Sequence, residues 1–226
     1  LGREELFAAL LSSIDSRFAL ETDFQHYQDD PVGFGQDVLG DTFTAEVKTL
    51  MESVRDYPIT VARSANATGK THGAARVAVW FNMCFPDSQV YVAAAPPESN
   101  LKKLLWGEIS SITEKHPKLF RDDTIRTLFI GRSARSFISG VSIPASGTPA
   151  QREAKFSGKH APYLLFIIDE GDAVPDDVYR GIESCMSGGH ARLLVMFNPR
   201  HQSGEVHRME RDGRANVVKL SAFAHP

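Results

Sequence analysis

Two patterns of apolar and polar residues alternate along the chain. Runs of consecutive apolar, often β-branched residues occur at 57–63, 88–95, 163–170, 192–199 and 216–223. Such runs predict strands buried on both faces of a sheet. Between them, residues 70–85, 99–117, 174–187 and 203–213 have apolar residues at helical spacing. This alternation predicts an α/β domain with a mainly parallel sheet flanked by helices.

Further elements are predicted outside this repeating pattern. Residues 4–21 and 44–56 predict helices, the second with Thr44 as its N-cap, and 23–40 predicts a mixed connector. We therefore divide the chain into an N-terminal helical extension or lid region, 1–56, and a core, 57–226. Short strands are predicted at 125–131, 133–141 and 142–147, and a polar loop at 148–161.

Composition narrows the class of protein only a little. The 226 residues are 42% hydrophobic and 23% charged, which is ordinary for a globular domain. The net charge of -3 provides no overall basic field for a nucleic acid, although it leaves room for a local patch. Cys84 and Cys185 lie far apart, which predicts buried thiols in a reducing compartment. There is no apolar run long enough for a membrane span and no signal peptide, so we expect no membrane partner.

The stretch RSANATGKT, 63–71, ends like a phosphate-binding loop but does not begin like one. Gly69, Lys70 and Thr71 match the end of the Walker A pattern, whereas Ser64 stands where that pattern has Gly. A strand before the loop and a helix after it would point backbone N–H groups and the positive end of the helix dipole at one spot. The alternative is a chance match at the start of a helix.

If the loop binds nucleotide, its residues have distinct expected roles. Lys70 would reach the β- and γ-phosphates, and the Thr71 hydroxyl would bind Mg²⁺. The nucleotide-binding residues would be Arg63, Ser64, Ala65, Asn66, Ala67, Thr68, Gly69, Lys70 and Thr71.

Asp169 and Glu170 follow the most apolar of the predicted strands. Two adjacent carboxylates at a buried strand end are costly unless a cation or hydrogen-bond donors offset them. We expect Asp169 to hold Mg²⁺ and Glu170 to act as general base on the attacking water. The alternative is an acidic pair that caps the next helix.

Other polar residues are candidates for catalysis. Asn198 ends the strand at 192–199 and could sense the γ-phosphate, or it could simply form a turn before Pro199. The transition state of phosphoryl transfer calls for further positive charge, which Arg63 or Arg152 could supply. Arg132 and Arg135 are weaker candidates, and solvated surface positions remain open for all four.

These segments resemble the large terminase subunit of tailed bacteriophages, the ATP-driven motor that packages DNA into capsids. The resemblance covers roughly residues 30 to 226 and rests on DPVGFGQDVLG (30–40), RSANATGKT (63–71), FSGKHA (156–161), LLFIIDEGDAVPDDVYRGIES (164–184) and MFNPRHQSG (196–204). It implies a P-loop NTPase fold of the RecA-like, ASCE type and a Mg²⁺-dependent ATPase with ATP as its nucleotide.

The resemblance also assigns residues to motifs. It implies that Lys70 and Thr71 are the Walker A pair, Asp169 the Walker B acid and Glu170 the catalytic glutamate. Asn198 matches the coupling motif, and Arg152 is our choice of arginine finger. Thr44 and Val47 fall where family members often carry an aromatic residue and a Gln near the adenine.

Partners are implied by the resemblance alone. They are double-stranded DNA, a portal protein, a small terminase subunit and further copies in a homo-oligomeric ring, all in the host cell cytoplasm. The C-terminal nuclease domain of full-length relatives is not expected in this chain, which we take for a fragment without nuclease activity. Candidate DNA contacts are Lys102, Lys103, Arg121, Arg126 and Lys155.

Three other functions remain open from the sequence. A helicase-type ATPase would require a second RecA-like domain, for which the chain is too short unless it is truncated. A nucleotide-binding assembly module without hydrolysis is favoured by Ser64 and Val47 but opposed by Glu170. A small-molecule kinase fits least well, because Glu170 follows Asp169 directly.

Overall fold

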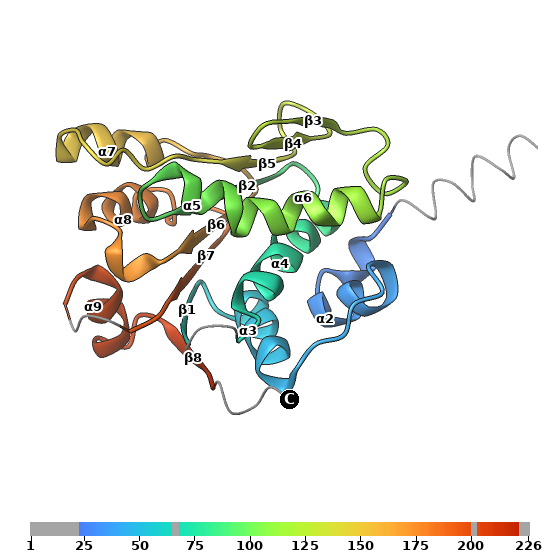
Figure 1. Ribbon diagram of the computed structural model, residues 1–226, viewed down its shortest axis with the longest axis horizontal. Coiled ribbons are helices and arrows are strands. Elements are labelled where there is room, and N and C mark those ends of the chain that lie inside the picture. The colour runs from blue at the N-terminus through green and yellow to red at the C-terminus, as the bar shows by residue number, and fades with distance from the viewer. Residues whose placement is uncertain (1–22, 65–67, 200–202, 222–226) are drawn as a thin grey trace, which may run out of the picture.

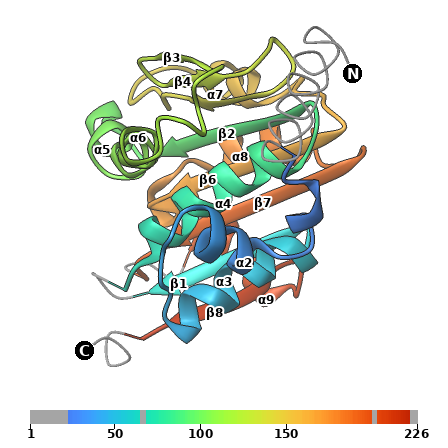
Figure 2. The same cartoon turned by 90° about the vertical axis from the view of Figure 1, so that its right-hand side faces the viewer.

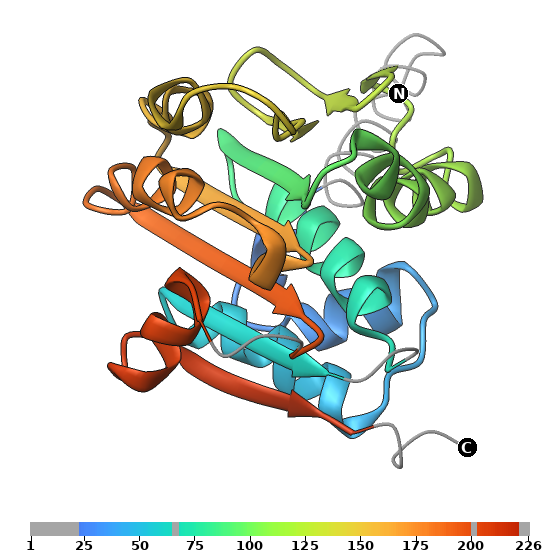
Figure 3. The same ribbon diagram turned by 60° about the vertical axis from the view of Figure 1, so that its left-hand side comes forward.

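The computed structural model describes residues 23–64, 68–199 and 203–221. They form an eight-stranded sheet in the order β3-β4-β5-β2-β6-β7-β1-β8. The strands are β1 (Ile59–Ser64), β2 (Ser88–Ala94), β3 (Thr124–Arg126), β4 (Phe129–Gly131), β5 (Phe137–Gly140), β6 (Tyr163–Asp169), β7 (His190–Phe197) and β8 (Asn216–Leu220). All pairs from β5 to β8 are parallel, and the arrowheads of these strands point the same way in Figure 3. Only β4 runs against its neighbours β3 and β5.

Helices cover both faces of this sheet. On one face lie α3 (Ala45–Asp56), α4 (Lys70–Cys84), α5 (Glu98–Lys103) and α6 (Leu105–Lys115), and Figure 2 shows α3 and α4 in front of the strands. On the other face lie α7 (Pro149–Phe156), α8 (Asp176–Glu183) and α9 (Glu205–Arg211), on the left of Figure 1. Short turns complete the chain: η1 (Gln25–Tyr27), α2 (Pro31–Gly33), η2 (Phe34–Val38) and η3 (Gly171–Ala173). The predicted α/β sheet flanked by helices is confirmed.

The apolar run of β6 shows why its sequence lacks alternation. Leu165 and Ile167 belong to the core beneath α4, whereas Leu164, Phe166 and Ile168 belong to the core beneath α8. Successive side chains of a strand point to opposite faces, so a strand covered on both sides needs apolar residues throughout. Strand β6 is therefore covered on both faces along its length, up to Asp169 at its end.

Several predicted elements take a different form in the structure. The predicted helix 99–117 is divided into α5 and α6 at Leu104, whose φ of -98° and ψ of -89° are not helical. The predicted strand at 142–147 is wrong, because this segment has no strand pairing. The predicted polar loop at 148–161 is also wrong: α7 occupies most of it, and Thr148 and Gln151 form a capping box at its start. The predicted helix at 4–21 lies outside the described residues.

The second predicted helix of the N-terminal region is confirmed as α3. The Thr44 hydroxyl accepts a hydrogen bond from the Val47 amide at 3.4 Å, as an N-cap should. Val47, Leu50 and Met51 are buried in the same core as α4. The helix therefore packs directly on the domain that carries the loop.

The predictions about the two cysteines and about membrane-spanning segments can be compared with the structure. Both Cys84 and Cys185 are free and buried. Within the described ranges, none of the helices combines the length and apolar character that a membrane span requires.

Candidate functional site

Three of the predicted motifs meet at one edge of the sheet, where β1, β6 and β7 end. The strands are parallel and neighbouring: Arg63 pairs in register with Phe197, and Ile168 with Val195. Their last residues, Ser64, Asp169 and Phe197, therefore lead the chain out at the same edge. β7 lies between the strand that enters the loop and the strand that ends in the acidic pair. This is the position in which open α/β sheets bind ligands.

The described ends of the loop are compact. Ser64 closes β1 and is only 4% exposed, while Thr68 is 1% exposed. The left-handed turn falls on Gly69, whose φ is 77°, and not on Ser64. Helix α4 begins at the next residue, Lys70, so its N-terminal N–H groups lie at this edge. Ala65, Asn66 and Ala67 lie outside the described residues.

Asn198 joins the two sides of this edge. Lys70 Nζ donates a hydrogen bond to Asn198 Oδ1 at 2.5 Å, and Ser64 Oγ donates to the same oxygen at 3.3 Å. The amide oxygen thus lies among the groups predicted to bind phosphates. An anionic ligand at the loop would compete with Asn198 for the ammonium group of Lys70, since both accept from it.

The two residues of the acidic pair, Asp169 and Glu170, differ in their surroundings and backbone conformation. Asp169 is 2% exposed, and its Oδ1 accepts a hydrogen bond from the Glu170 amide at 2.9 Å. Burial raises the pKa of Asp169, and the Glu170 amide and the charge of Lys70 offset this only in part. Glu170 has left-handed backbone angles, with φ 52° and ψ 42°, which are uncommon for a residue other than Gly. Strain of this kind gathers at functional sites.

The residues at this edge fit a magnesium nucleotide. Mg²⁺ prefers a few oxygen ligands from the protein and completes its shell with water and phosphate oxygens. The Asp169 carboxylate and the Thr71 hydroxyl would provide such oxygens. Among the described residues there is no cluster of three or more His, Cys, Asp or Glu side chains suited to a metal. A metal held largely by phosphates and water does not require one.

The two leading arginine candidates are placed differently. Arg63 lies at the end of β1, beside the loop, with its Nε 3.5 Å from Glu210 Oε1. Arg152 is on α7, where its Nε donates to Asp177 Oδ2 at 2.6 Å and its Nη1 donates to the Gly147 carbonyl at 2.7 Å. These contacts hold Arg152 against α8 and do not bring it to the loop.

The weaker candidates also form ion pairs. Arg132 pairs with Asp123 at 3.2 Å, and Arg135 pairs with Asp87 at 3.4 Å.

One residue of the site has no prediction in the sequence analysis. Asn100 on α5 donates from Nδ2 to Glu170 Oε2 at 3.2 Å and to the Ala95 carbonyl at 3.3 Å. The signal for it was positional, because β2 is a parallel strand that ends at the same edge. Any polar residue soon after that strand was therefore a candidate.

The topology, the loop between β1 and α4 and the acidic pair after β6 together define the P-loop NTPase fold of the ASCE type. Within that class, the chain has the fold of the ATPase domain of phage large terminases, as solved structures show. A variant of the large terminase ATPase domain of Thermus phage P74-26 superposes with a TM-score of 0.61 at 19% identity, covering 76% of this chain and 72% of that one. The large terminase of a thermophilic bacteriophage superposes with a TM-score of 0.59 at 13% identity, covering 80% and 46%. Its complex with ADP gives a TM-score of 0.58, covering 80% and 45%.

A curated relative supports the same family resemblance. The chain is 26% identical over 182 residues to a probable terminase large subunit of Enterobacteria phage P7. That match covers 79% of this chain but only 36% of the relative, so the chain spans little more than a third of its length. No protein-family model matches the chain.

Proposed function

We propose that the chain is the ATP-hydrolysing motor domain of a phage terminase large subunit, which drives double-stranded DNA into a capsid. The observation that carries the proposal is the meeting of Lys70, Asn198 and the Asp169–Glu170 pair at one edge of a sheet with the terminase ATPase fold. The likeness to the phage P7 protein supports the same conclusion from sequence.

In this proposal each residue of the edge has one task. Lys70 and the N–H groups that open α4 bind the β- and γ-phosphates. Thr71 and Asp169 hold Mg²⁺, which neutralises charge on the phosphates when it is bound. Glu170 accepts a proton from the attacking water. Asn198 loses its hydrogen bond with Lys70 when a phosphate of the nucleotide binds that ammonium group.

The arginine finger remains Arg152 in this proposal. Its side chain is 15% exposed and paired with Asp177, so Arg152 would leave this ion pair to reach the nucleotide of a neighbouring copy in a ring. Donation of an arginine between subunits is a known arrangement in phosphoryl transfer and makes turnover depend on assembly. Nucleotide binding by the single chain is therefore the more direct test.

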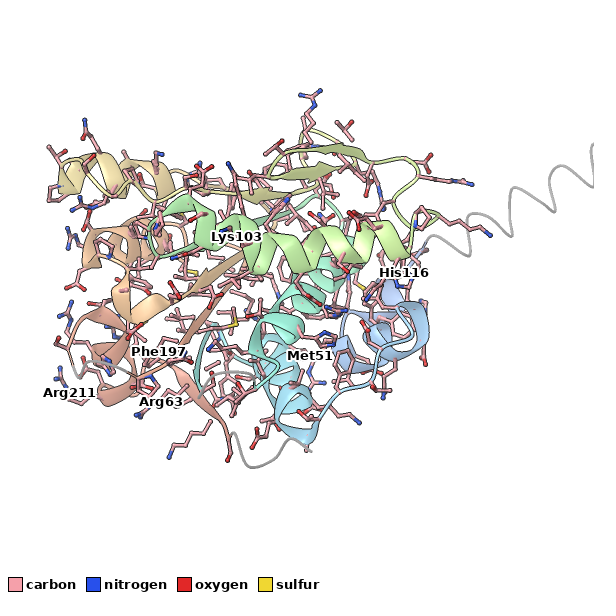
Figure 4. The ribbon with its side chains drawn as sticks, viewed as in Figure 1. Met51, Arg63, Lys103, His116, Phe197 and Arg211 are labelled. Carbon is pink, nitrogen blue, oxygen red and sulfur yellow. The ribbon has the colours of Figure 1, made fainter. Side chains whose placement is uncertain are left out.

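DNA is proposed to pass the side of the molecule formed by α5 and α7. Lys102 forms an ion pair with Glu98 at 2.5 Å, and Lys155 donates to the Ser142 carbonyl at 3.2 Å. The Ser142 hydroxyl in turn contacts Glu98, which places both lysines around one carboxylate. Lys103 ends the same helix, and it is labelled in Figure 4 together with His116, the residue that follows α6. Arg121 and Arg126 come after His116 along the chain, and Arg126 ends β3. Phosphate contacts by such cations would bind without sequence preference.

The remaining partners follow from the terminase resemblance. They are a portal protein, a small terminase subunit and other copies of the chain, in the host cell cytoplasm. The division into an extension at 1–56 and a core at 57–226 is retained as a proposal, together with the absence of nuclease activity from this chain.

The proposal is tested by titrating the chain with a slowly hydrolysed ATP analogue and Mg²⁺ in a calorimeter. We expect saturable binding that Lys70→Ala weakens by about 100-fold or more, since one charged phosphate contact is worth several kcal/mol. Lys115→Ala, at the far end of α6, is the matched control and should bind like the original chain. If millimolar nucleotide fails to bind, or if Lys70→Ala binds equally well, the ATPase proposal is wrong for this chain.

A further inference from the structure

A second charged cluster lies just behind the loop, and the proposed roles do not explain it. It consists of Arg63 at the end of β1 and of His207 and Glu210, three residues apart on α9. Glu210 Oε1 lies 3.5 Å from Arg63 Nε, and Glu210 Oε2 lies 3.4 Å from His207 Nδ1. The side chains of Glu210 and His207 are only 11% and 14% exposed. The cluster therefore places a largely buried carboxylate beside the candidate nucleotide site.

The polar atoms of this cluster are incompletely satisfied. Glu210 Oε1 and His207 Nε2 are both buried without a hydrogen-bond partner, and the contact of Oε1 with Arg63 is an ion pair without hydrogen-bond geometry. A buried polar group without a partner costs about 1–3 kcal/mol. Stability alone gives no reason to keep two such atoms side by side, so the cluster calls for another explanation.

The cluster contacts Arg63 and Phe197, the residues that directly precede Ser64 and Asn198 of the candidate site. Glu210 pairs with Arg63, which precedes Ser64, and His207 packs edge-on against Phe197, which precedes Asn198, with ring centroids 5.3 Å apart. Arg63 and Phe197 are themselves register partners in β1 and β7, and Figure 4 shows both beside α9. Ser64 and Asn198 in turn share the hydrogen bond that closes the site. One turn of α9 thus contacts both strand ends that carry this hydrogen bond.

Helix α9 is also fixed from its other side. Arg208 donates to Asp176 Oδ2 at 2.6 Å, and the Glu205 amide donates to Asp176 Oδ1 at 3.0 Å. Asp176 opens α8, six residues after Glu170 along the chain. Because α9 is anchored there, a force on Glu210 or His207 is resisted by the segment that follows the acidic pair. Helix α9 therefore acts as a brace between the ends of β1 and β7 and the start of α8.

We propose that Glu210 is a positioning residue of the nucleotide site, which acts through Arg63 and, with His207, fixes the ends of β1 and β7 from which Ser64 and Asn198 project. The inference rests on the proposed nucleotide site. It assigns Glu210 no contact with the nucleotide. Its carboxylate holds the Arg63 side chain, and the position of Ser64, the next residue and the last of β1, depends on that contact.

The test compares two glutamates with the same substitution. Glu210→Gln keeps the shape and removes the charge that pairs with Arg63. Glu183→Gln is the control, because Glu183 ends α8 and pairs with Arg214 at 2.7 Å instead of Arg63. We expect Glu210→Gln to raise the Kd for the Mg²⁺-bound ATP analogue about fivefold, the size of a partly exposed ion pair, and Glu183→Gln to leave it unchanged. Thermal unfolding of each variant establishes that it folds.

A double-mutant cycle with Arg63→Met shows whether Glu210 acts through Arg63. If it does, the double variant binds no more weakly than Arg63→Met alone. Effects that multiply would mean that the two residues act independently, which contradicts the proposal. An unchanged or tighter Kd in Glu210→Gln also contradicts it, and a tighter one would mean that the carboxylate withholds Arg63 from the phosphates.

Amide hydrogen exchange without nucleotide separates this inference from the proposed function. Exchange at 61–64 and 193–198 should be faster in Glu210→Gln than in Glu183→Gln, because only the first loses a contact to these strand ends. If the original chain binds no nucleotide but this difference appears, the proposed function fails and the brace stands. If exchange is the same in both variants, the brace is wrong whatever the chain binds.

Discussion

Two carboxylates near helix α4, Glu108 and Asp169, differ in how far their neighbours offset the effect of burial on their pKa. Arg76 is 2% exposed and forms ion pairs with Asp41, at 2.7 Å, and with Glu108. Burial pushes the pKa of Glu108 upward, but the hydrogen bond and charge of Arg76 outweigh it, and the pKa is lowered. At the end of β6, the Glu170 amide and the charge of Lys70 do not outweigh the burial of Asp169, and the pKa of that carboxyl is raised.

This difference in charge compensation distinguishes a charge cluster that supports the fold from a candidate ligand-binding site. Around Arg76, two carboxylates form ion pairs with one buried cation, so its charge is already neutralised within the folded chain. Around Asp169, a buried carboxylate retains an unmet preference for positive charge, and a metal bound to phosphate would meet it. Burial of charge alone therefore does not identify a functional residue, whereas incomplete compensation at the end of a strand beside the loop marks a candidate.

The comparison is tested most strongly at Glu170, next to the undercompensated carboxylate. Glu170→Gln should lower the turnover of ATP by about 10²- to 10⁴-fold, the usual contribution of a general base, while the Kd of the ATP analogue changes little. Phosphate release under assembly conditions and calorimetry measure the two quantities. Turnover that survives the substitution would assign Glu170 to helix capping and favour the module without hydrolysis.

At Arg76 the comparison predicts a loss of stability without a loss of function. Arg76→Met keeps the apolar stem but leaves Asp41 and Glu108 without their cation. We expect the free energy of unfolding at pH 7 to fall by about 2–3 kcal/mol, the low end for a broken buried pair, because both carboxylates are partly exposed. Urea denaturation measures this change. Arg55→Met is the control, since its ion pair with Asp56 is far more exposed and should matter little.

The pH dependence of the Arg76 effect has a defined sign. Because the pKa of Glu108 is lowered in the folded chain, its contribution is present above the ordinary value of 4.5 and is lost as the pH falls through the folded-state pKa. The difference between Arg76→Met and the original chain should shrink on acidification below 4.5. A difference that stays constant would mean that Arg76 acts through packing.

At Asp169 a smaller effect of opposite sign is expected. Its pKa is raised in the folded chain, so its contribution to stability is present below the ordinary value of 3.8 and is lost as the pH rises through the folded-state pKa. At pH 7, Asp169→Asn should therefore raise the Tm, by about 2–4 °C for each kcal/mol regained, while weakening Mg²⁺-dependent nucleotide binding. Calorimetric melting checks this against Asp122→Asn, an exposed control. A lower Tm would show that the carboxylate is already compensated.

The central layout was predictable because it depends on periodicity and chain order. The five apolar runs are the five long parallel strands, and parallel strands bring their ends to one edge. Helix α7 has start signals in its sequence, since Thr148 and Gln151 form a capping box and Pro149 occupies the first helical position. The polar composition of 148–161 favours a loop instead, and the structure shows that the start signals are the stronger indication here.

Other relations had no local signal. Arg152 and Asp177 are 25 residues apart, and Lys70 and Asn198 are 128 apart, so no spacing rule could pair them. Asn100 reaches Glu170 only because α5 folds back over the end of β2.

The sequence by itself determined the layers, the parallel direction of the central strands and the edge at which Ser64, Asp169 and Asn198 emerge, because these follow from local periodicity and from the crossovers that parallel strands require. Only the tertiary structure decided which charges are compensated. Arg76 lies between two carboxylates, Glu210 lies beside Arg63 with one oxygen that accepts no hydrogen bond, and Asp169 is buried with its pKa raised. The burial of a charge and the placement of its ion-pair partners are set only when distant segments pack together. These two quantities decide whether a buried charge stabilises the fold or favours the binding of a ligand.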